Sequence, residues 1–350
     1  MLHAIIMAGG SGTRFWPKSR ERSPKQLQAI GTERPLVVET FARVRSLVAP
    51  ERVHVITNAA YEEQVRALLP QLPAANVVGE PIGRDTAAAI GLAAERLLAS
   101  DANAEMIVMP ADHVIAPVAQ FERAVRAAQA VLSAQPETLI TFGIKPTYPA
   151  TGFGYIERGR KLPDREGVAV FAVQAFTEKP KLEVAQEFLR AGDHYWNAGI
   201  FAWRAATIRK LIERLLPELA AGLDELRRRP LAEVYPRLPK ISIDYGVLEK
   251  APDRTVIEAP FEWDDVGSWR ALERHGRADE SGNVATGATA LIDARGNVID
   301  ARDGLVALIG VSDLVVVHTP DVTLVCPKER AEDVRRIIEQ LKARGETKFL

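Results

Sequence analysis

Short runs of apolar residues alternate along the chain with longer segments in which apolar residues recur every three or four positions. The runs are Ala4 to Met7, Val53 to Ile56, Met106 to Met109, Leu139 to Phe142 and Val168 to Val173. Helical spacing is found in Tyr61 to Leu69, Thr86 to Ala99 and Phe121 to Leu132. Short uninterrupted runs indicate buried strands, so this alternation predicts an α/β protein with a doubly wound mixed sheet, most of it parallel.

The pattern changes near residue 280. Short β-type runs follow, at Ala288 to Ile292, Val298 to Ile299, Leu305 to Ile309, Leu314 to His318 and Val322 to Val325. Ile292-Asp293-Ala294-Arg295 recurs as Ile299-Asp300-Ala301-Arg302 across a Gly-Asn turn, which suits a hairpin or successive rungs of a solenoid. Lys328 to Arg344 has helical spacing. We therefore expect a catalytic domain over residues 1–278 and a small β-rich, β-helix-like domain with a terminal helix over 279–350, without catalytic residues.

Composition narrows the class of protein. The 350 residues are 47% hydrophobic and 26% charged, which is ordinary for a globular protein with a sizeable core. A net charge of −1 argues against a general nucleic-acid binder. The single cysteine, Cys326, fits a reducing cytoplasm, and no segment has the length of apolar sequence that a membrane span requires. We expect a cytoplasmic protein with no nucleic-acid or membrane partner, and exposed strand edges in the β-rich domain favour a homodimer.

A glycine-rich loop follows the first predicted strand directly. Gly9, Gly10, Ser11, Gly12 and Thr13 open it, and five Lys or Arg residues against one Glu follow before residue 26. Glycines let backbone N–H groups approach phosphate oxygens, and the cations meet the phosphate charge. The loop is neither a dinucleotide fingerprint, because its third glycine position holds Phe15, nor a P-loop, because Thr13-Arg14 follows the last glycine. We expect these five residues to bind a nucleoside triphosphate.

The loop continues as Trp16-Pro17-Lys18-Ser19 and Pro24-Lys25-Gln26, and it resembles the signature of the sugar-nucleotide pyrophosphorylases in their mannose-1-phosphate guanylyltransferase branch. The resemblance spans roughly residues 3 to 340, with at least six motifs in family order. It implies a Rossmann-like fold of the nucleotide-diphospho-sugar transferase type. It also implies transfer of GMP from GTP to mannose 1-phosphate with Mg²⁺, giving GDP-mannose and pyrophosphate. We expect the short, single-activity kind, because members fused to an isomerase are longer by a cupin-like domain.

Attack of one phosphate on another needs no general base, because the nucleophile is already an anion. Cations and a metal must offset the charge repulsion, and Arg14 and Lys25 are the candidate cations. The alternative is a basic surface loop. In the family, the Asp after a strand and the Asp before Val-Gly bind Mg²⁺, and the resemblance transfers this role to Asp112 and Asp265. A turn or helix cap is the alternative for each, with Asp264 as a possible substitute ligand.

Base selection is expected from Glu80, Arg84, Asp85 and Thr86. Guanine presents two adjacent donors, N1–H and the exocyclic amine, which a carboxylate accepts well, so Glu80 is the preferred contact. The family motif has Asn at the position of Asp85 and Pro at that of Ala88. Whether Asp85 contacts guanine therefore stays open, and the Asp85-Thr86 pair alternatively caps the following helix.

The resemblance assigns Gly154, Glu178 and Asn197 to the hexose and Lys179 to its phosphate. The alternative for Glu178-Lys179 is a solvated surface pair. The segment Ser242 to Lys250 also resembles a family motif. We interpret it as structural, with contact between ligand and Asp244 or Tyr245 as the alternative. His113, beside Asp112, is expected to be a neighbour of the site rather than a ligand. Two other functions remain open: the same chemistry with another hexose 1-phosphate or NTP, and a catalytically silent sugar-nucleotide-binding regulatory relative.

Overall fold

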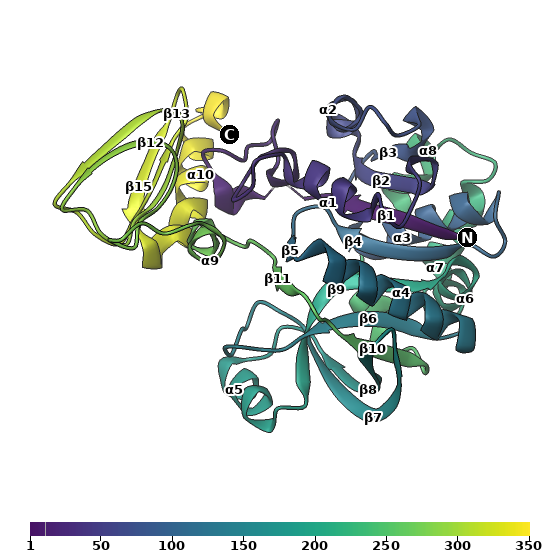
Figure 1. The fold of residues 1–350 in the computed structure, drawn as a ribbon. Helices are drawn as coiled ribbons and strands as arrows, with labels where there is room; N and C mark the ends of the chain where they lie inside the picture. The colour runs from purple at the N-terminus through teal and green to yellow at the C-terminus, as the bar shows by residue number, and fades with distance from the viewer. Residues whose placement is uncertain (11) are drawn as a thin grey trace. The chain divides into compact units, whose positions relative to one another are not determined.

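The computed structural model describes residues 1–10 and 12–350, which form two compact units (Figure 1). The sheet unit comprises Met1–Gly9, Thr40–Ala111 and Ile115–Trp263. The solenoid unit comprises Gly10–Glu39, Asp112–Val114 and Asp264–Leu350. The boundary predicted at residue 278 stays a proposal, since the solenoid unit also takes in the glycine-rich loop and the segment at Asp112.

Within the described residues, the sheet unit has a nine-stranded mixed sheet in the order β3-β2-β1-β4-β9-β6-β10-β8-β7. The strands are β1 (Leu2–Ala8), β2 (Val53–Asn58), β3 (Val77–Glu80), β4 (Glu105–Pro110), β6 (Leu139–Ile144), β7 (Tyr155–Arg165), β8 (Val168–Thr177), β9 (His194–Arg204) and β10 (Arg254–Glu258). All five predicted apolar runs lie in these strands. The expectation of a mostly parallel sheet is wrong, because β9 runs antiparallel between β4 and β6. A tight turn joins β7 to β8, and such a turn connects only antiparallel neighbours.

Helices cover both faces of this sheet, as the doubly wound prediction requires. They are α2 (Glu62–Leu68), α3 (Asp85–Leu98), α4 (Val118–Ala134), α5 (Leu182–Ala191), α6 (Ala205–Leu215), α7 (Pro217–Glu225) and α8 (Leu231–Val234). Helices α3, α6 and α7 share one core cluster with Met106 and Trp203. Helix α4 packs elsewhere, where Phe121 contacts Phe261 edge-on and Phe261 contacts Phe142. Figure 1 shows α4 in front of β6 and β9.

The solenoid unit contains β12 (Val284–Ile292), β13 (Val298–Ile309), β14 (Leu314–His318) and β15 (Thr323–Pro327). Strands β12, β13 and β14 pair in parallel as successive solenoid rungs and not as a hairpin. The two copies of Ile-Asp-Ala-Arg do not lie opposite each other, since Ile292 pairs with Ile309 and Ile299 with Ala285. Asparagines at the turns link the rungs: Asn283 Oδ1 accepts from Asn297, and Asn297 Oδ1 accepts from the Leu314 amide. The two runs predicted around residues 298–309 are one strand, β13. The β-helix-like prediction is confirmed.

The terminal helix α10 (Val334–Ala343) is shorter than predicted, because Lys328–Asp333 forms a 3-10 turn. Its apolar residues pack with Phe15 and Trp16 of the glycine-rich loop, beside the short helix α9 (Leu272–His275). The segments α1 (Leu36–Val44), β5 (Val114–Ala116) and β11 (Glu262–Asp264) each contain a boundary between the two units, and β5 pairs with β11. Among the described residues, no helix combines the length and apolar character needed to cross a bilayer.

Candidate active site

The glycine-rich loop, Asp112 and Asp265 line one cavity of about 280 Å³ inside the solenoid unit. We call it the loop pocket. Its lining consists of Gly12, Thr13, Arg14, Phe15, Lys25, Asp112, His113, Asp265, Val266, Gly267 and Arg335. The four residues predicted to be catalytic are therefore together. Gly10 precedes this lining, and Ser11, predicted with it, lies outside the described residues.

Gly12 fits its position because it has no side chain. Its φ is 59°, and a Cβ there would lie 2.2 Å from the Cβ of Lys25. The loop is held by further contacts: Ser19 Oγ donates to the carbonyl of Gly12, and Gln26 Nε2 donates to that of Gly10 at 3.2 Å. The backbone of the loop is thus fixed against the 3-10 turn Lys25–Leu27.

Lys25 is a buried cation with defined partners. Only 5% of the residue is exposed, so the alternative of a solvated basic loop does not describe it. Its Nζ donates to Asp112 Oδ2 at 2.9 Å and to the main-chain oxygen of Asp265 at 2.7 Å. Arg14 Nη1 donates to the carbonyl of Gly267 at 3.3 Å. Two cations and two carboxylates thus meet in one cavity.

The two carboxylates differ in acidity. Burial opposes ionisation of Asp112, but Lys25 and His113 outweigh it and hold the pKa of Asp112 below its usual value. Burial raises the pKa of Asp265, and the charges of Asp264 and Asp112 raise it further against the effect of Lys25. His113 Nε2 lies 3.9 Å from Asp112 Oδ1, in line with a neighbouring role. The repulsion between Asp112 and Asp265 makes the pocket suited to additional positive charge.

Asp264, the possible substitute ligand, is already engaged. Its oxygens accept from Arg274 Nε at 2.5 Å and from the Val266 amide at 2.7 Å, and His275 Nε2 lies at 3.0 Å. Burial works against its ionisation, but these partners hold the pKa of Asp264 well below its usual value. Val266 has a φ of 45°, an unusual conformation for a β-branched residue. The Asp264 bond to Val266 stabilises this turn and leaves the side chain of Asp265 at the pocket.

The predicted base-binding residues lie in the sheet unit. Glu80 ends β3, is 6% exposed and accepts a hydrogen bond from the Tyr235 hydroxyl through Oε1. Its Oε2 adjoins Gly9, since a Cβ on that glycine would lie 3.8 Å away. Burial raises the pKa of Glu80 despite the bond from Tyr235. Sequence reasoning missed Tyr235, for which no motif gave a signal.

The next motif opens α3 at Asp85, one residue before the start of the predicted helical spacing at Thr86. Asp85 has a φ of 65°, and its Oδ1 accepts the amide of Thr86 at 2.8 Å. Thr86 Oγ1 accepts from the amide of Ile243 at 2.8 Å. Arg84 immediately precedes the helix. Asp85 and Thr86 therefore have structural contacts at the helix start, but neither is the cap that the alternative expected, since Arg84 holds the N-cap position and no side chain caps it.

The predicted sugar-phosphate residues also cluster, within the sheet unit. The main-chain N–H of Asn197 donates to the main-chain carbonyl of Gly154 at 2.8 Å. A Cβ at Gly154 would lie 2.6 Å from Glu178 Oε2. Lys179 Nζ donates to Glu178 Oε1 at 2.6 Å, with the Lys179 side chain 60% exposed and that of Glu178 only 12%. Glu178 is thus largely buried, which does not fit the alternative that Glu178 and Lys179 form a solvated surface pair.

Asp244 belongs to this cluster as well. It begins the π-helical turn Asp244–Leu248, and its Oδ1 accepts from Asn197 Nδ2 at 3.0 Å. Asn197 Oδ1 already accepts from Thr141 Oγ1 at 3.0 Å and from the Gly199 amide at 3.1 Å. The carbonyl of the Asn197 side chain is therefore saturated, and one N–H remains for a ligand. Burial, with the charge of Glu178, raises the pKa of Asp244 to about 7.

Comparisons with known proteins agree with these motifs. The nucleotidyl transferase family matches residues 3–282, and the "MannoseP isomerase/GMP-like beta-helix domain" matches residues 287–341. Mannose-1-phosphate guanylyltransferase ManC of Salmonella typhimurium strain LT2 is 37% identical over 98% of this chain and 74% of its own length. Mannose-1-phosphate guanylyltransferase of Escherichia coli strain K12 is 35% identical, again over 98% of this chain and 74% of its own length.

A solved structure is similar over almost the whole chain. The crystal structure of a Thermus thermophilus protein described as "mannose-1-phosphate geranyltransferase" is 38% identical, with a TM-score of 0.88. The alignment covers 97% of this chain and 99% of that one. The fold, the two matched families and these identities together show that the chain belongs to the nucleotidyl transferase family, in its mannose-1-phosphate guanylyltransferase branch.

Proposed function

We propose that this protein transfers GMP from GTP to mannose 1-phosphate, giving GDP-mannose and pyrophosphate. The names of its relatives support the choice of substrates. The observation that carries the chemistry is the buried Lys25, which joins Asp112 and the main chain of Asp265 directly behind Gly12. A protein that only bound a nucleotide, without catalysing its transfer, would not need two carboxylates beside the cations of the loop pocket.

The reaction is an in-line displacement at the α-phosphorus of GTP. A phosphate oxygen of mannose 1-phosphate forms the new P–O bond, and the bond from the α-phosphorus to the bridging oxygen breaks. Pyrophosphate leaves with the electron pair, and no proton transfer is needed. Arg14 and Lys25 would offset the charge that develops, while backbone N–H groups from Gly9 to Thr13 hold phosphate oxygens. Ser11 remains a prediction from the sequence.

We propose that Asp112 and Asp265 hold Mg²⁺ in this reaction. Mg²⁺ is commonly bound by one or two carboxylates together with substrate phosphates, and this pocket offers two. Burial, together with the charges of Asp264 and Asp112, raises the pKa of Asp265, and an added cation in the pocket would offset this cost of ionisation. When bound, the ion would neutralise phosphate charge. Asp264 is a poorer candidate because its oxygens are bound to Arg274 and Val266.

The remaining assignments follow the motifs. Glu80 is proposed to accept from guanine through Oε2, with Arg84, Asp85 and Thr86 as further nucleotide contacts. Gly154, Glu178 and Asn197 are proposed to hold the hexose, and the exposed Lys179 its phosphate. A cytoplasmic location and a homodimer remain predictions from the sequence.

Pyrophosphate release from a matrix of four NTPs and several hexose 1-phosphates tests the proposal. We expect GTP with mannose 1-phosphate to be the preferred pair. Lys25→Ala and Asp265→Asn should lower the rate at least about 100-fold with folding retained, the effect typical of a lost transition-state contact. Lys210→Ala, at a side chain that is 75% exposed, is the matched control and should leave the rate unchanged.

Each other outcome has a definite meaning. Equal rates with UTP would contradict the specificity for guanine. A preference for a different hexose 1-phosphate would contradict mannose while retaining the chemistry. No turnover with any pair, in a folded protein that binds GDP-mannose, would favour the regulatory alternative.

A further inference from the structure

The terminal helix contributes a side chain to the loop pocket. Arg335, in the first turn of α10, lines the cavity together with Arg14, Lys25, Asp112 and Asp265. The sequence pattern placed this helix in a domain without catalytic residues, and neither the motifs nor the family resemblance pointed to Arg335.

Packing holds α10 beside the glycine-rich loop. Val334, Ile337, Ile338 and Leu341 of the helix share a hydrophobic cluster with Phe15. Beyond the helix, the carbonyl of Phe349 accepts a hydrogen bond from Trp16 Nε1 at 2.7 Å. All of these residues belong to the solenoid unit. The position of Arg335 is therefore set by the helix and not by a free chain end.

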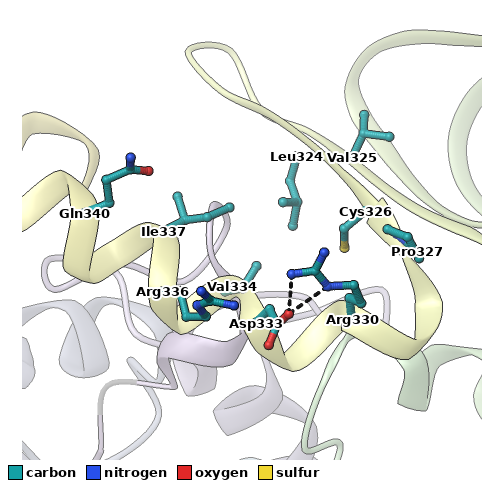
Figure 2. A pocket seen from close by; sticks show the side chains of 10 residues that line it. All are labelled: Leu324, Val325, Cys326, Pro327, Arg330, Asp333, Val334, Arg336, Ile337 and Gln340. Carbon is teal, nitrogen blue, oxygen red and sulfur yellow. Dashed lines mark hydrogen bonds and ion pairs between the residues drawn. The ribbon is translucent and has the colours of Figure 1, made fainter.

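The neighbouring arginine points elsewhere and provides a comparison. Arg336 lines a different cavity of about 590 Å³, formed by α10 and β15. Figure 2 shows Arg336 on the helix, with Cys326 on the opposite strand and the ion pair between Arg330 and Asp333 nearby. Consecutive residues of one helix thus extend into two separate cavities. A variant at each can distinguish the loop pocket from the general charge of the helix.

Arg335 is also the unpaired cation of the loop pocket. Within the described residues its side chain forms no ion pair and no hydrogen bond, whereas the side chain of Lys25 is bound to Asp112 and that of Arg14 to a main-chain carbonyl. Two cations and two carboxylates among the other lining residues offset each other, counting His113 as neutral. Arg335 therefore gives the pocket its excess positive charge. A guanidinium also matches phosphate geometry with two parallel hydrogen bonds.

We propose that Arg335 binds phosphate oxygens of the nucleoside triphosphate and of the pyrophosphate product. This inference rests on the proposed function, because it requires a triphosphate in the loop pocket. It assigns the C-terminal helix a part in substrate binding, beyond its place in the fold. It requires no particular base or sugar, since all NTPs share these phosphates.

The test compares Arg335→Ala, Arg335→Lys and Arg336→Ala in the full chain. Binding of GTP with Mg²⁺, and of inorganic pyrophosphate with Mg²⁺, is measured by calorimetry without sugar phosphate. We expect Arg335→Ala to weaken both at least about tenfold, as expected for loss of a charge-assisted contact, and Arg335→Lys to weaken them less. Arg336→Ala should bind both as the wild type does.

Two further readouts separate binding from structure. The KM for GTP should rise in Arg335→Ala while the KM for mannose 1-phosphate stays unchanged. The dependence of GTP affinity on salt concentration should become shallower, because one fewer cation meets the phosphates. Thermal unfolding should be the same for both alanine variants, since both side chains are exposed.

The inference is overturned if GTP and pyrophosphate affinities of Arg335→Ala stay within twofold of those of Arg336→Ala. It is also overturned if the affinity for mannose 1-phosphate falls equally. If the wild type prefers another NTP, the proposed specificity fails, and the same comparison with that NTP still tests Arg335.

Discussion

Burial and neighbouring charge set the protonation of the acids among the candidate residues of each unit. The pKa of Asp112 lies below its usual value because Lys25 and His113 overcome burial, whereas burial and nearby carboxylates raise that of Asp265. Burial and the charge of Glu178 raise the pKa of Asp244 to about 7, against the effects of Asn197 and Lys179. Three aspartates of one chain are therefore expected to ionise over different ranges of pH.

Asp244→Asn should flatten the pH dependence of stability. The folded-state pKa of Asp244 lies above its unfolded value of about 4, so the contribution of this residue is fully present below pH 4 and is lost as pH rises through about 7. The variant has no such loss, and its Oδ1 can still accept from Asn197. Urea unfolding of both proteins at several values between pH 4 and 8 measures the difference. Parallel stability curves for the two proteins would contradict the prediction.

At the scale of elements, candidate residues of both units lie in turns with left-handed backbone conformations. Positive φ angles occur at Asp85, Lys179 and Val266, and Gly12 has a φ of 59° in the glycine-rich loop. Each lies in a motif that the sequence singled out. Such conformations persist only where surrounding contacts hold them, as the Asp264 bond holds Val266. The loops of the site are thus defined by local contacts as much as by their residue types.

Gly12→Ala should disrupt the glycine-rich loop. The left-handed conformation alone costs about 1–2 kcal/mol for alanine, and the new Cβ would overlap Lys25. We expect activity to fall more than about tenfold, because Lys25 must move. Gly167→Ala is the matched control, since Gly167 has a φ of 68° and open space around its Cβ position. It should lose about 1–2 kcal/mol of stability and no activity. Equal activity in both variants would show that the overlap is relieved without harm.

At the scale of the molecule, the solenoid unit combines segments that are far apart in sequence. Lys18 Nζ donates to Asp300 Oδ2 at 2.7 Å, across 282 positions. Arg302 donates to the carbonyl of Thr32 at 2.9 Å. These two contacts join the glycine-rich loop and the segment that follows it to β13, so the β-rich region supports the loop as well as its own strands.

Asp300→Asn should destabilise the protein by about 3–5 kcal/mol, because it leaves Lys18, whose side chain is only 11% exposed, without its counter-charge. Lys18→Met combined with Asp300→Leu should recover most of this loss, since apolar residues of similar size replace both charges. Asp303→Asn, at an exposed residue of the same strand, should stay within about 0.5 kcal/mol of the wild type. Chemical denaturation measures all three. A double variant no more stable than Asp300→Asn would exclude ion pairing as the cause.

Much of the fold and most of the candidate residues could be predicted from local patterns. Apolar runs located five strands of the large sheet, and helical spacing located α2, α3 and α4. The motifs predicted two groups of residues: the glycine-rich loop with Asp112 and Asp265, and Gly154 with Glu178. The members of each group lie together within their own unit. These features are local, because alternation of apolar and polar residues reflects which face of an element is buried.

Only the tertiary structure decided which members of a motif are free to act. Lys25 is a buried partner of Asp112, 87 positions away, and of Asp265, 240 positions away. Within the part of the chain that the structure describes, the side chain of Asp264 is hydrogen-bonded and that of Asp265 is not, although the two residues are adjacent and chemically identical. The antiparallel direction of β9 and the presence of Arg335 in the loop pocket likewise follow from packing. The physical reason is that hydrogen bonds, burial and charge pairing act across space, so the sequence determined which groups are available and the fold determined their partners.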